Sequence, residues 1–173
     1  MRLQRYLKGR IDEIGKITIR THEAAIRIIA TKGQLGTPAA SDHCMQYIVA
    51  VVLIFGRLTA MDYEDTVAAD PRIDALREKM TCMEDPQFTL AYHDPEMRAI
   101  PNGIAVEFKD GSQMEEVVVS YPLGHRFRRD EGIPLLEEKF RRNLSLRFPP
   151  LQQQAITVLC RDQAKLEKMP VNE

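Results

Sequence analysis

The sequence has 173 residues, a formal net charge of −1, 44% hydrophobic and 28% charged residues, which is typical of a folded globular chain. The near-neutral balance argues against a nucleic-acid binder that depends on neutralising phosphates. Three widely spaced cysteines form no CxxC pair and no Cys/His ligand pattern, so neither a zinc site nor an iron–sulfur cluster is expected. Such sparse thiols suit a reducing cytoplasm, and the polar N-terminal segment lacks the apolar core of a secretory signal.

The first predicted elements are a strand and a short helix. Lys16 to Thr21 alternates polar and apolar residues, which indicates a half-buried strand. Thr21 is placed to cap a helix over the following segment HEAAIRIIA, and Gly33 and Pro38 mark the loop that ends it. This loop leads into the most apolar part of the chain.

The stretch from Ser41 to Phe55 is predicted to be the buried helix around which the chain folds. From Cys44 onward it is almost wholly apolar, with Ser41 placed to cap it and Gly56 placed to end it. The run is shorter than the roughly 18 apolar residues that cross a bilayer, so no membrane span is expected. A helix that is apolar on all sides must be covered by neighbouring elements.

Helices and then strands are predicted to provide that cover. Helices should start near Thr59 and at Asp70-Pro71, where capping residues precede apolar positions at helical spacing. Strands should begin at Phe88, Ile104 and Met114, where apolar residues recur every second position. Together with the strand from Lys16, they predict an α+β fold with a small mixed or antiparallel sheet of about four strands packed with helices.

The C-terminal third is predicted to be helical. Apolar residues from Ile133 to Phe148 recur at steps of three and four, and a second amphipathic helix should start at Leu151 after two prolines. The stripes are broad, so one small sheet is not expected to cover them. Exposed apolar faces of this kind mark interfaces or aggregation-prone surfaces.

Two groups of polar residues are candidates for chemistry. His43 and Tyr47 are four residues apart, so one helix would place them on one face beside Asp42, where they could donate protons to a substrate oxygen or bind a carboxylate. The simpler reading is a capped helix whose tyrosine hydroxyl finds a structural partner. Spacing alone favours that reading.

The second group is the segment Tyr121-Pro-Leu-Gly124-His125, followed by the basic cluster Arg126, Arg128 and Arg129. A glycine turn after a strand can present backbone N–H groups to an anion, with histidine or arginine beside them. A solvated basic loop is the alternative, and it is the commoner arrangement for arginine. No P-loop, GxSxG, GxGxxG or HExxH motif is present.

Several stretches in order along the chain resemble the C-terminal portion of the MmgE/PrpD family. They are ITIRTHEAAIRII, DHCMQYIVAVVLIFGRLTAMDYED, DPRIDALREKM, YHDPEMRAI, VEFKDGSQMEEVVVSYPLGH and FPPLQQQ, and the likeness runs from about Arg10 to the last residue. The resemblance implies an α+β domain of the family type over residues 1–130. Residues 131–173 would then be a C-terminal helical segment that packs on the family's helical domain.

The resemblance also implies an activity. Family dehydratases remove water from 2-methylcitrate to give 2-methyl-cis-aconitate in the methylcitrate cycle of propionate catabolism, without an iron–sulfur cluster or other cofactor; a related branch decarboxylates cis-aconitate. Family members are cytoplasmic and commonly dimeric. On the family pattern Tyr47 matches an active-site tyrosine with His43 beside it, and Gly124-His125 matches a recurrent pair on a loop, assigned here to substrate binding.

The family's principal Asp, His and Lys residues precede the stretch seen here, so the chain alone is expected to be inactive. The expected partners are a tricarboxylate substrate and either the missing N-terminal helical domain or a second copy of this chain, with no nucleic acid and no membrane. The alternative hypothesis is a non-catalytic binding or assembly module that folds and associates but turns nothing over.

Overall fold

The computed structural model describes residues 2–170 and leaves out residue 1 and residues 171–173, so the last three residues of the predicted segment 131–173 lie outside it. The chain divides into two compact units between Ser120 and Tyr121. Each unit is described by itself.

The first unit contains a four-stranded mixed sheet with the order β2-β1-β3-β4, which confirms the predicted α+β class. Its strands are β1 (Ile14–Thr21), β2 (Met80–Glu84), β3 (Asn102–Phe108) and β4 (Val117–Val119). The central strand β1 pairs parallel with β2 and antiparallel with β3, and β3 pairs antiparallel with β4. A parallel pair needs a long crossover between its strands, and the helical segment between β1 and β2 provides it.

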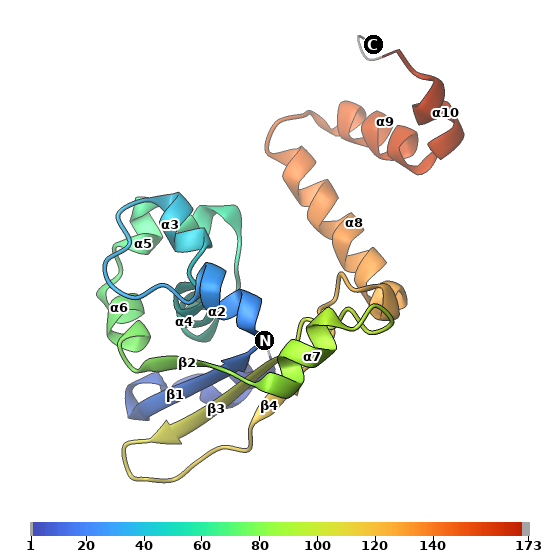
Figure 1. Cartoon of the computed structure of the whole chain (residues 1–173). Coiled ribbons are helices and arrows are strands. Elements are labelled where there is room, and N and C mark those ends of the chain that lie inside the picture. The colour runs from blue at the N-terminus through green and yellow to red at the C-terminus, as the bar shows by residue number, and fades with distance from the viewer. Residues whose placement is uncertain (1, 171–173) are drawn as a thin grey trace. The chain divides into compact units, whose positions relative to one another are not determined.

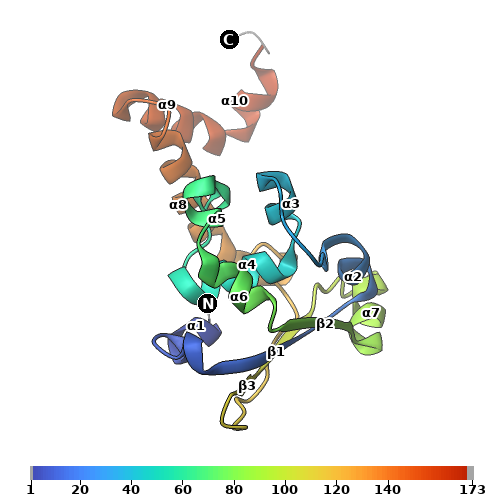
Figure 2. The same ribbon diagram turned by 90° about the vertical axis from the view of Figure 1, so that its left-hand side faces the viewer.

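The helices of this crossover cover one face of the sheet. They are α2 (Glu23–Ile29), α3 (Pro38–Asp42), α4 (Met45–Phe55), η2 (Ala60–Tyr63), α5 (Asp65–Ala68) and α6 (Pro71–Arg77), and α1 (Arg2–Leu7) and η1 (Ile11–Glu13) precede β1. Figures 1 and 2 show α4 and α6 above the strands. Ile17 and Ile19 of β1 are fully buried beneath this layer and belong to one core cluster with Val51 of α4 and Ile73 of α6.

The apolar helix does lie in the core, as predicted, but it starts later than expected. Helix α4 begins at Met45 with Cys44 as its N-cap, and it ends at Gly56, whose φ of 71° is readily adopted by glycine. Ser41 and Asp42 belong to the separate helix α3, because Thr37 caps that helix and Pro38 occupies its first position. The prediction of one helix from Ser41 was therefore wrong.

Two of the strand predictions also need correction. The segment from Phe88 forms helix α7 (Pro86–His93), because Asp85 accepts a hydrogen bond from the Gln87 N–H and Pro86 fits the first helical position. The missing strand is β2, which pattern reading did not identify. The last strand starts at Val117, and only a single bridge from Gln113 to β3 precedes it.

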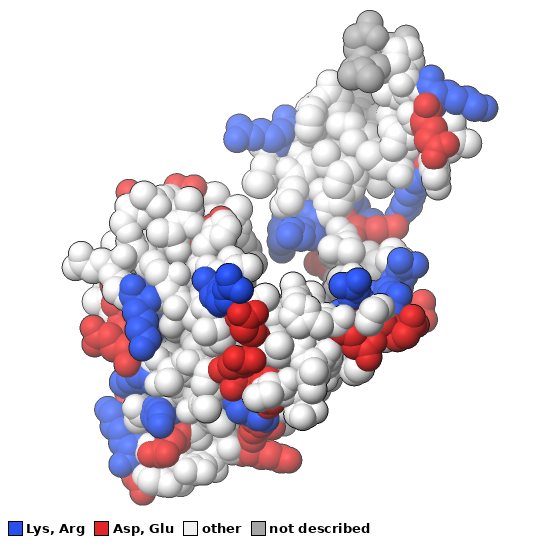
Figure 3. All heavy atoms as spheres, in the orientation of Figure 1, with Lys and Arg blue, Asp and Glu red and all other residues white. Residues whose placement is uncertain are grey.

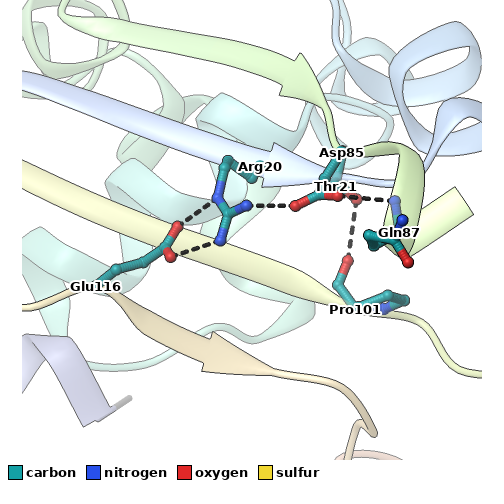
Figure 4. Close-up of polar contacts among 6 residues, drawn as sticks. All are labelled: Arg20, Thr21, Asp85, Gln87, Pro101 and Glu116. Carbon is teal, nitrogen blue, oxygen red and sulfur yellow. Dashed lines mark hydrogen bonds and ion pairs between the residues drawn. The ribbon is translucent and has the colours of Figure 1, made fainter. Parts of the chain in front are cut away.

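An arginine on the second face of the sheet joins three segments of this unit. Arg20 of β1 donates from Nε and Nη2 to the two carboxylate oxygens of Glu116, at 2.7 and 2.6 Å, and pairs through Nη1 with Asp85 (Figure 4). Gly103 makes room for this contact, because a Cβ there would lie 2.7 Å from Glu116 Oε1. The hydrogen bond from Arg20 lowers the pKa of Glu116. Each end of this network is already satisfied within the protein.

The second unit is helical, with η3 (Arg126–Arg128), α8 (Arg129–Ser145), α9 (Pro150–Arg161) and α10 (Gln163–Lys168). Gly132 of α8 approaches the preceding turn closely, since a Cβ there would lie 2.0 Å from the Leu123 carbonyl oxygen. Large apolar side chains of the unit remain in solvent, with exposures such as 54% for Leu136 and 82% for Leu151. The unit therefore has far more apolar surface than it covers itself.

Candidate functional site

Tyr47 lies in the first turn of α4, and its hydroxyl faces the protein interior. The side chain is 2% exposed, and the hydroxyl donates to the Asp62 backbone carbonyl at 2.5 Å. Its ring stacks on Tyr63, with ring centroids 5.8 Å apart. Burial raises the pKa of Tyr47, with smaller contributions from Tyr63 and Asp62. The hydroxyl thus stays protonated at neutral pH, and its proton is directed at a structural acceptor.

The acceptor of this hydrogen bond is held firmly in place. Asp62 is fully buried, and its carboxylate accepts from both the backbone N–H and the hydroxyl of Thr59, at 2.7 and 2.8 Å. Thr59 and Asp62 thus form a capping box at the helix start that the sequence predicts near Thr59. Arg57 Nη2 reaches the other carboxylate oxygen at 2.8 Å as an ion pair. The Tyr47 hydroxyl is therefore held by the hydrogen-bonded segment from Arg57 to Asp62, which follows α4.

His43 lies in a different environment. It follows α3 as its C-cap, and its side chain is 68% exposed. Nδ1 contacts the Asp42 carboxylate and the Ala39 carbonyl, two acceptors, so this nitrogen carries the proton. The pKa of His43 is raised, mainly by the hydrogen bond to Asp42 and to a smaller extent by the hydrogen bond to the Ala39 carbonyl. Because α3 and α4 are separate helices, the predicted i,i+4 face shared with Tyr47 does not form.

A polar pocket of about 540 Å³ lies beside the start of α4. Its most buried cation is Arg77 at the end of α6, whose side chain is 9% exposed. Arg77 pairs with Asp74 through Nη1 and donates from Nη2 to the Gly33 carbonyl at 2.9 Å. The lining residues are Thr31, Lys32, Gly33, Gln34, Gln46, Asp74, Arg77, Glu78, Met80 and Thr81.

Sequence reasoning missed Arg77 and Lys32 as candidates. Arg77 directly follows the buried Leu76, which is a weak signal for a half-buried position. The contact that buries its guanidinium comes from Gly33, 44 residues earlier in the chain. Local periodicity cannot reveal a contact over that separation.

The Gly124-His125 pair belongs to the second unit. His125 caps η3, since its Nδ1 accepts from the Phe127 N–H at 3.1 Å, and its ring packs 4.6 Å from that of Tyr121. Gly124 has φ outside the left-handed region, and a Cβ there would meet nothing within 4 Å. The fold therefore does not require glycine at this position.

The basic cluster after His125 is partly occupied by structural contacts. Arg128 donates from Nε and Nη2 to Glu131, at 3.0 and 2.7 Å, and from Nη1 to the Tyr121 carbonyl at 2.9 Å. Arg126 lies over the ring of Phe127. On the face drawn in Figure 3, basic and acidic side chains are interspersed. The contacts of Arg126 and Arg128 with their own segment favour the solvated-loop reading of the cluster.

Residues 2–170 contain neither a metal-binding cluster nor a membrane-spanning helix. No group of three or more His, Cys, Asp or Glu side chains in this range could hold a metal ion. None of its helices is long and apolar enough to cross a bilayer. Cys44 is buried, Cys82 is half-buried with a pKa raised by burial to about 11, and Cys160 is exposed. The raised pKa keeps the Cys82 thiol protonated at neutral pH, and a protonated thiol is a poor nucleophile.

The first unit is a mixed-sheet domain covered by helices. Its candidate reactive or binding groups are a tyrosine, a histidine and an arginine. Residues 1–163 match the MmgE/PrpD C-terminal domain, and the chain belongs to the MmgE/PrpD family. It is 63% identical over 161 residues to the 2-methylcitrate dehydratase of Cupriavidus necator and equally so to that of Escherichia coli K12. It is 57% identical over 145 residues to the mitochondrial 2-methylcitrate dehydratase of Yarrowia lipolytica.

These matches cover most of this chain but little of its relatives. The two bacterial alignments include 93% of this chain and 33% of each relative, and the yeast alignment includes 84% and 28%. The chain therefore spans about a third of the length of the curated relatives it matches.

Proposed function

We propose that this chain is the C-terminal part of a 2-methylcitrate dehydratase, a hydro-lyase that forms 2-methyl-cis-aconitate in propionate catabolism. The observation that carries the proposal is the 63% identity over 161 residues to relatives of that name. The chain acts in the cytoplasm, and it needs the helical domain that precedes the matching region in the relatives. Alone, it turns over no substrate.

Within this function we propose Tyr47 and His43 as its catalytic candidates. Dehydration beside a carboxylate needs a base for a carbon-bound proton and an acid for the departing hydroxyl. His43 has a raised pKa and a solvent-exposed ring, which supports a role as proton donor. Tyr47 can give its proton to a substrate only after it leaves the Asp62 carbonyl. Its part in catalysis therefore requires a local rearrangement after α4.

The turn at Gly124-His125 is proposed separately as a substrate-binding element. The support is that glycine there has no structural requirement, because its φ is ordinary and the space around it is open. A backbone that is accessible on this side leaves room for a ligand to approach closely. Gly124→Ala tests this directly, since the fold tolerates the added methyl group.

The second unit is proposed to provide the contact surface for the partner. Leu136, Phe140 and Val158 keep 54%, 37% and 63% of their surface exposed, and all lie on α8 or α9. Patches of this kind usually mark interfaces. In the assembled enzyme this surface packs on the helical domain, and the enzyme is a dimer. A non-catalytic assembly module would use the same surface, so the exposed helices alone do not separate the two functions.

A chimera tests the proposed function. This chain replaces the matching 161 residues of the Escherichia coli relative, and the purified protein is assayed for formation of the conjugated double bond of 2-methyl-cis-aconitate by ultraviolet absorbance. Dehydration of 2-methylcitrate at a rate near that of the unaltered relative supports the proposal. A folded chimera without activity means that this chain is an assembly module. Tyr47→Phe and His43→Gln are then introduced one at a time to locate catalytic contributions.

A further inference from the structure

Arg77 lines the polar pocket beside the start of α4 and is the most buried cation there. Although its side chain is 9% exposed, Arg77 Nε has no hydrogen-bond acceptor among residues 2–170. A buried polar group of this kind costs free energy unless something pairs with it, and the cost is larger when the group is charged. Arg77 lines the pocket of about 540 Å³, which has room for a small ligand that carries such an acceptor.

Other arginines in this protein show what that acceptor should be. Arg20 and Arg128 each close the edge formed by Nε and Nη2 on both oxygens of one carboxylate, and Arg72 closes it on Asp70 (Figure 4 for Arg20). Arg77 uses Nη2 for the Gly33 carbonyl and leaves Nε without a partner. The planar edge matches a carboxylate, with two parallel hydrogen bonds.

The rest of the pocket suits a ligand with several polar groups. Lys32 supplies a second cation, and Gln46, 4% exposed at the start of α4, supplies an amide. Asp74 and Glu78 also line the pocket, so its fixed charges balance. Because Asp74 and Glu78 repel anions, a ligand must place its carboxylates at Arg77 and Lys32, which an organic acid with separated carboxylates can do and a single compact phosphate cannot. The carboxylates of Asp74 and Glu78 can accept hydrogen bonds from a hydroxyl group of the same ligand.

Access to Nε needs a small movement, because the atom is shielded from solvent. The Gly33 carbonyl holds Nη2 of the same guanidinium, and Gly33 has a φ of 93°, in the left-handed region that glycine adopts readily. Carboxylate binding in the pocket requires the guanidinium to turn away from the Gly33 carbonyl, so that its Nε–Nη2 edge faces the ligand. One hydrogen bond to a carbonyl is then exchanged for two to a carboxylate.

We propose that Arg77 binds a carboxylate of a small polycarboxylic acid in this pocket, with Lys32 and Gln46 as further contacts. The identity of the acid rests on the proposed function, in which it is the tricarboxylate substrate. Arg77 is then a substrate-binding residue beside the start of α4, the helix that carries Tyr47.

The test is a titration of the 173-residue chain with citrate, followed by ¹H–¹⁵N NMR, in which arginine Nε–H groups give their own signals. Citrate should shift the Arg77 Nε–H signal and the amides of residues 31–34. Arg77→Gln should weaken citrate binding by about tenfold or more, because a charge-assisted pair is lost. Lys32→Gln should weaken it less, and this variant keeps the experiment decisive if Arg77→Gln does not fold.

The matched control is Arg72→Gln on the same helix, which removes an exposed arginine that already pairs with Asp70. It should leave citrate affinity unchanged. Inorganic phosphate at the same concentration should not shift the Arg77 signal. Absence of any citrate-induced change at Arg77 and residues 31–34, equal effects of citrate and phosphate, or equal loss of binding in the Arg72 and Arg77 variants would each overturn the inference.

The chimera separates this inference from the proposed function. If the chimera binds citrate through Arg77 but does not dehydrate 2-methylcitrate, the carboxylate site is supported and the proposed function is wrong. A chimera that dehydrates 2-methylcitrate with an unchanged KM after Arg77→Gln keeps the function and rejects the site. If both hold, Arg77→Gln raises KM for 2-methylcitrate by about tenfold.

Discussion

Replacing Tyr47 with phenylalanine separates a structural role of this residue from a chemical one. The substitution keeps the stacked ring and removes a hydroxyl that donates to the buried Asp62 carbonyl at 2.5 Å. An unpaired buried acceptor costs about 1–3 kcal/mol, and we expect the free energy of unfolding of the first unit to fall by about 1–2 kcal/mol. With a urea slope of about 2 kcal/mol per molar, the midpoint should fall by about 0.5–1 M.

Urea unfolding followed by far-ultraviolet circular dichroism measures this change. Tyr63→Phe is the matched control, because it removes a hydroxyl from the stacked neighbour while leaving the Tyr47 bond in place. We expect the control to lower the midpoint less. An unchanged midpoint for Tyr47→Phe would mean that its hydroxyl is not paired with Asp62 in solution and is already available to a substrate.

The remaining predictions concern packing, pH and association. Gly132→Ala should destabilise the second unit by about 1–3 kcal/mol in thermal unfolding, because its Cβ would overlap a backbone carbonyl, whereas Gly124→Ala should not. Burial lowers the pKa of His22 below its ordinary 6.5, so the unfolded chain takes up a proton that the folded chain does not. Stability should therefore fall as pH drops through 6.5. The loss should be smaller in His22→Asn, because His22 and not Thr21 is the N-cap of α2, accepting from the Ala25 N–H, and asparagine can take over that role. The chain should self-associate at micromolar concentration in sedimentation velocity, and exchange of Leu136 and Phe140 for serine should reduce the association.

Each of these has an outcome that contradicts it. Equal melting temperatures for the Gly132 and Gly124 variants would mean that α8 does not approach the preceding turn. An identical pH dependence of stability in the His22 variant and the unaltered chain would assign the acid loss to other groups. A stable monomer that binds no hydrophobic dye would mean that the exposed helices of the second unit need no partner.

Features set by local chemistry could be predicted from the sequence. Gly56 ends α4 in the left-handed region, Asp70-Pro71 starts α6, and the Thr59–Asp62 box caps η2, because each depends on residues within a single turn. The burial of α4 followed from its composition, since a helix without a polar face has to be covered.

Features set by competition or by distant contacts could not. Alternation over Phe88 to Tyr92 indicated a strand, yet Asp85 and Pro86 provided a helix start that outweighed it. The break between α3 and α4 separated His43 from the helix of Tyr47, because Pro38 had already begun a short helix. The guanidinium of Arg77 is held by the carbonyl of Gly33, which lies 44 residues earlier in the chain. The roles of Tyr47, His43, Gly124 and His125 stay predictions.

Complementation without a peptide link tests the central claim most directly, namely that this chain is one part of a composite dehydratase. The part of the Cupriavidus necator relative outside the 161 matching residues is purified alone, and this chain is titrated into it while 2-methylcitrate dehydration is followed. Each component alone should be inactive, and the mixture should gain activity that saturates near equal molar amounts. Turnover by this chain alone, or no activity at any ratio although the two parts bind each other, would contradict the account.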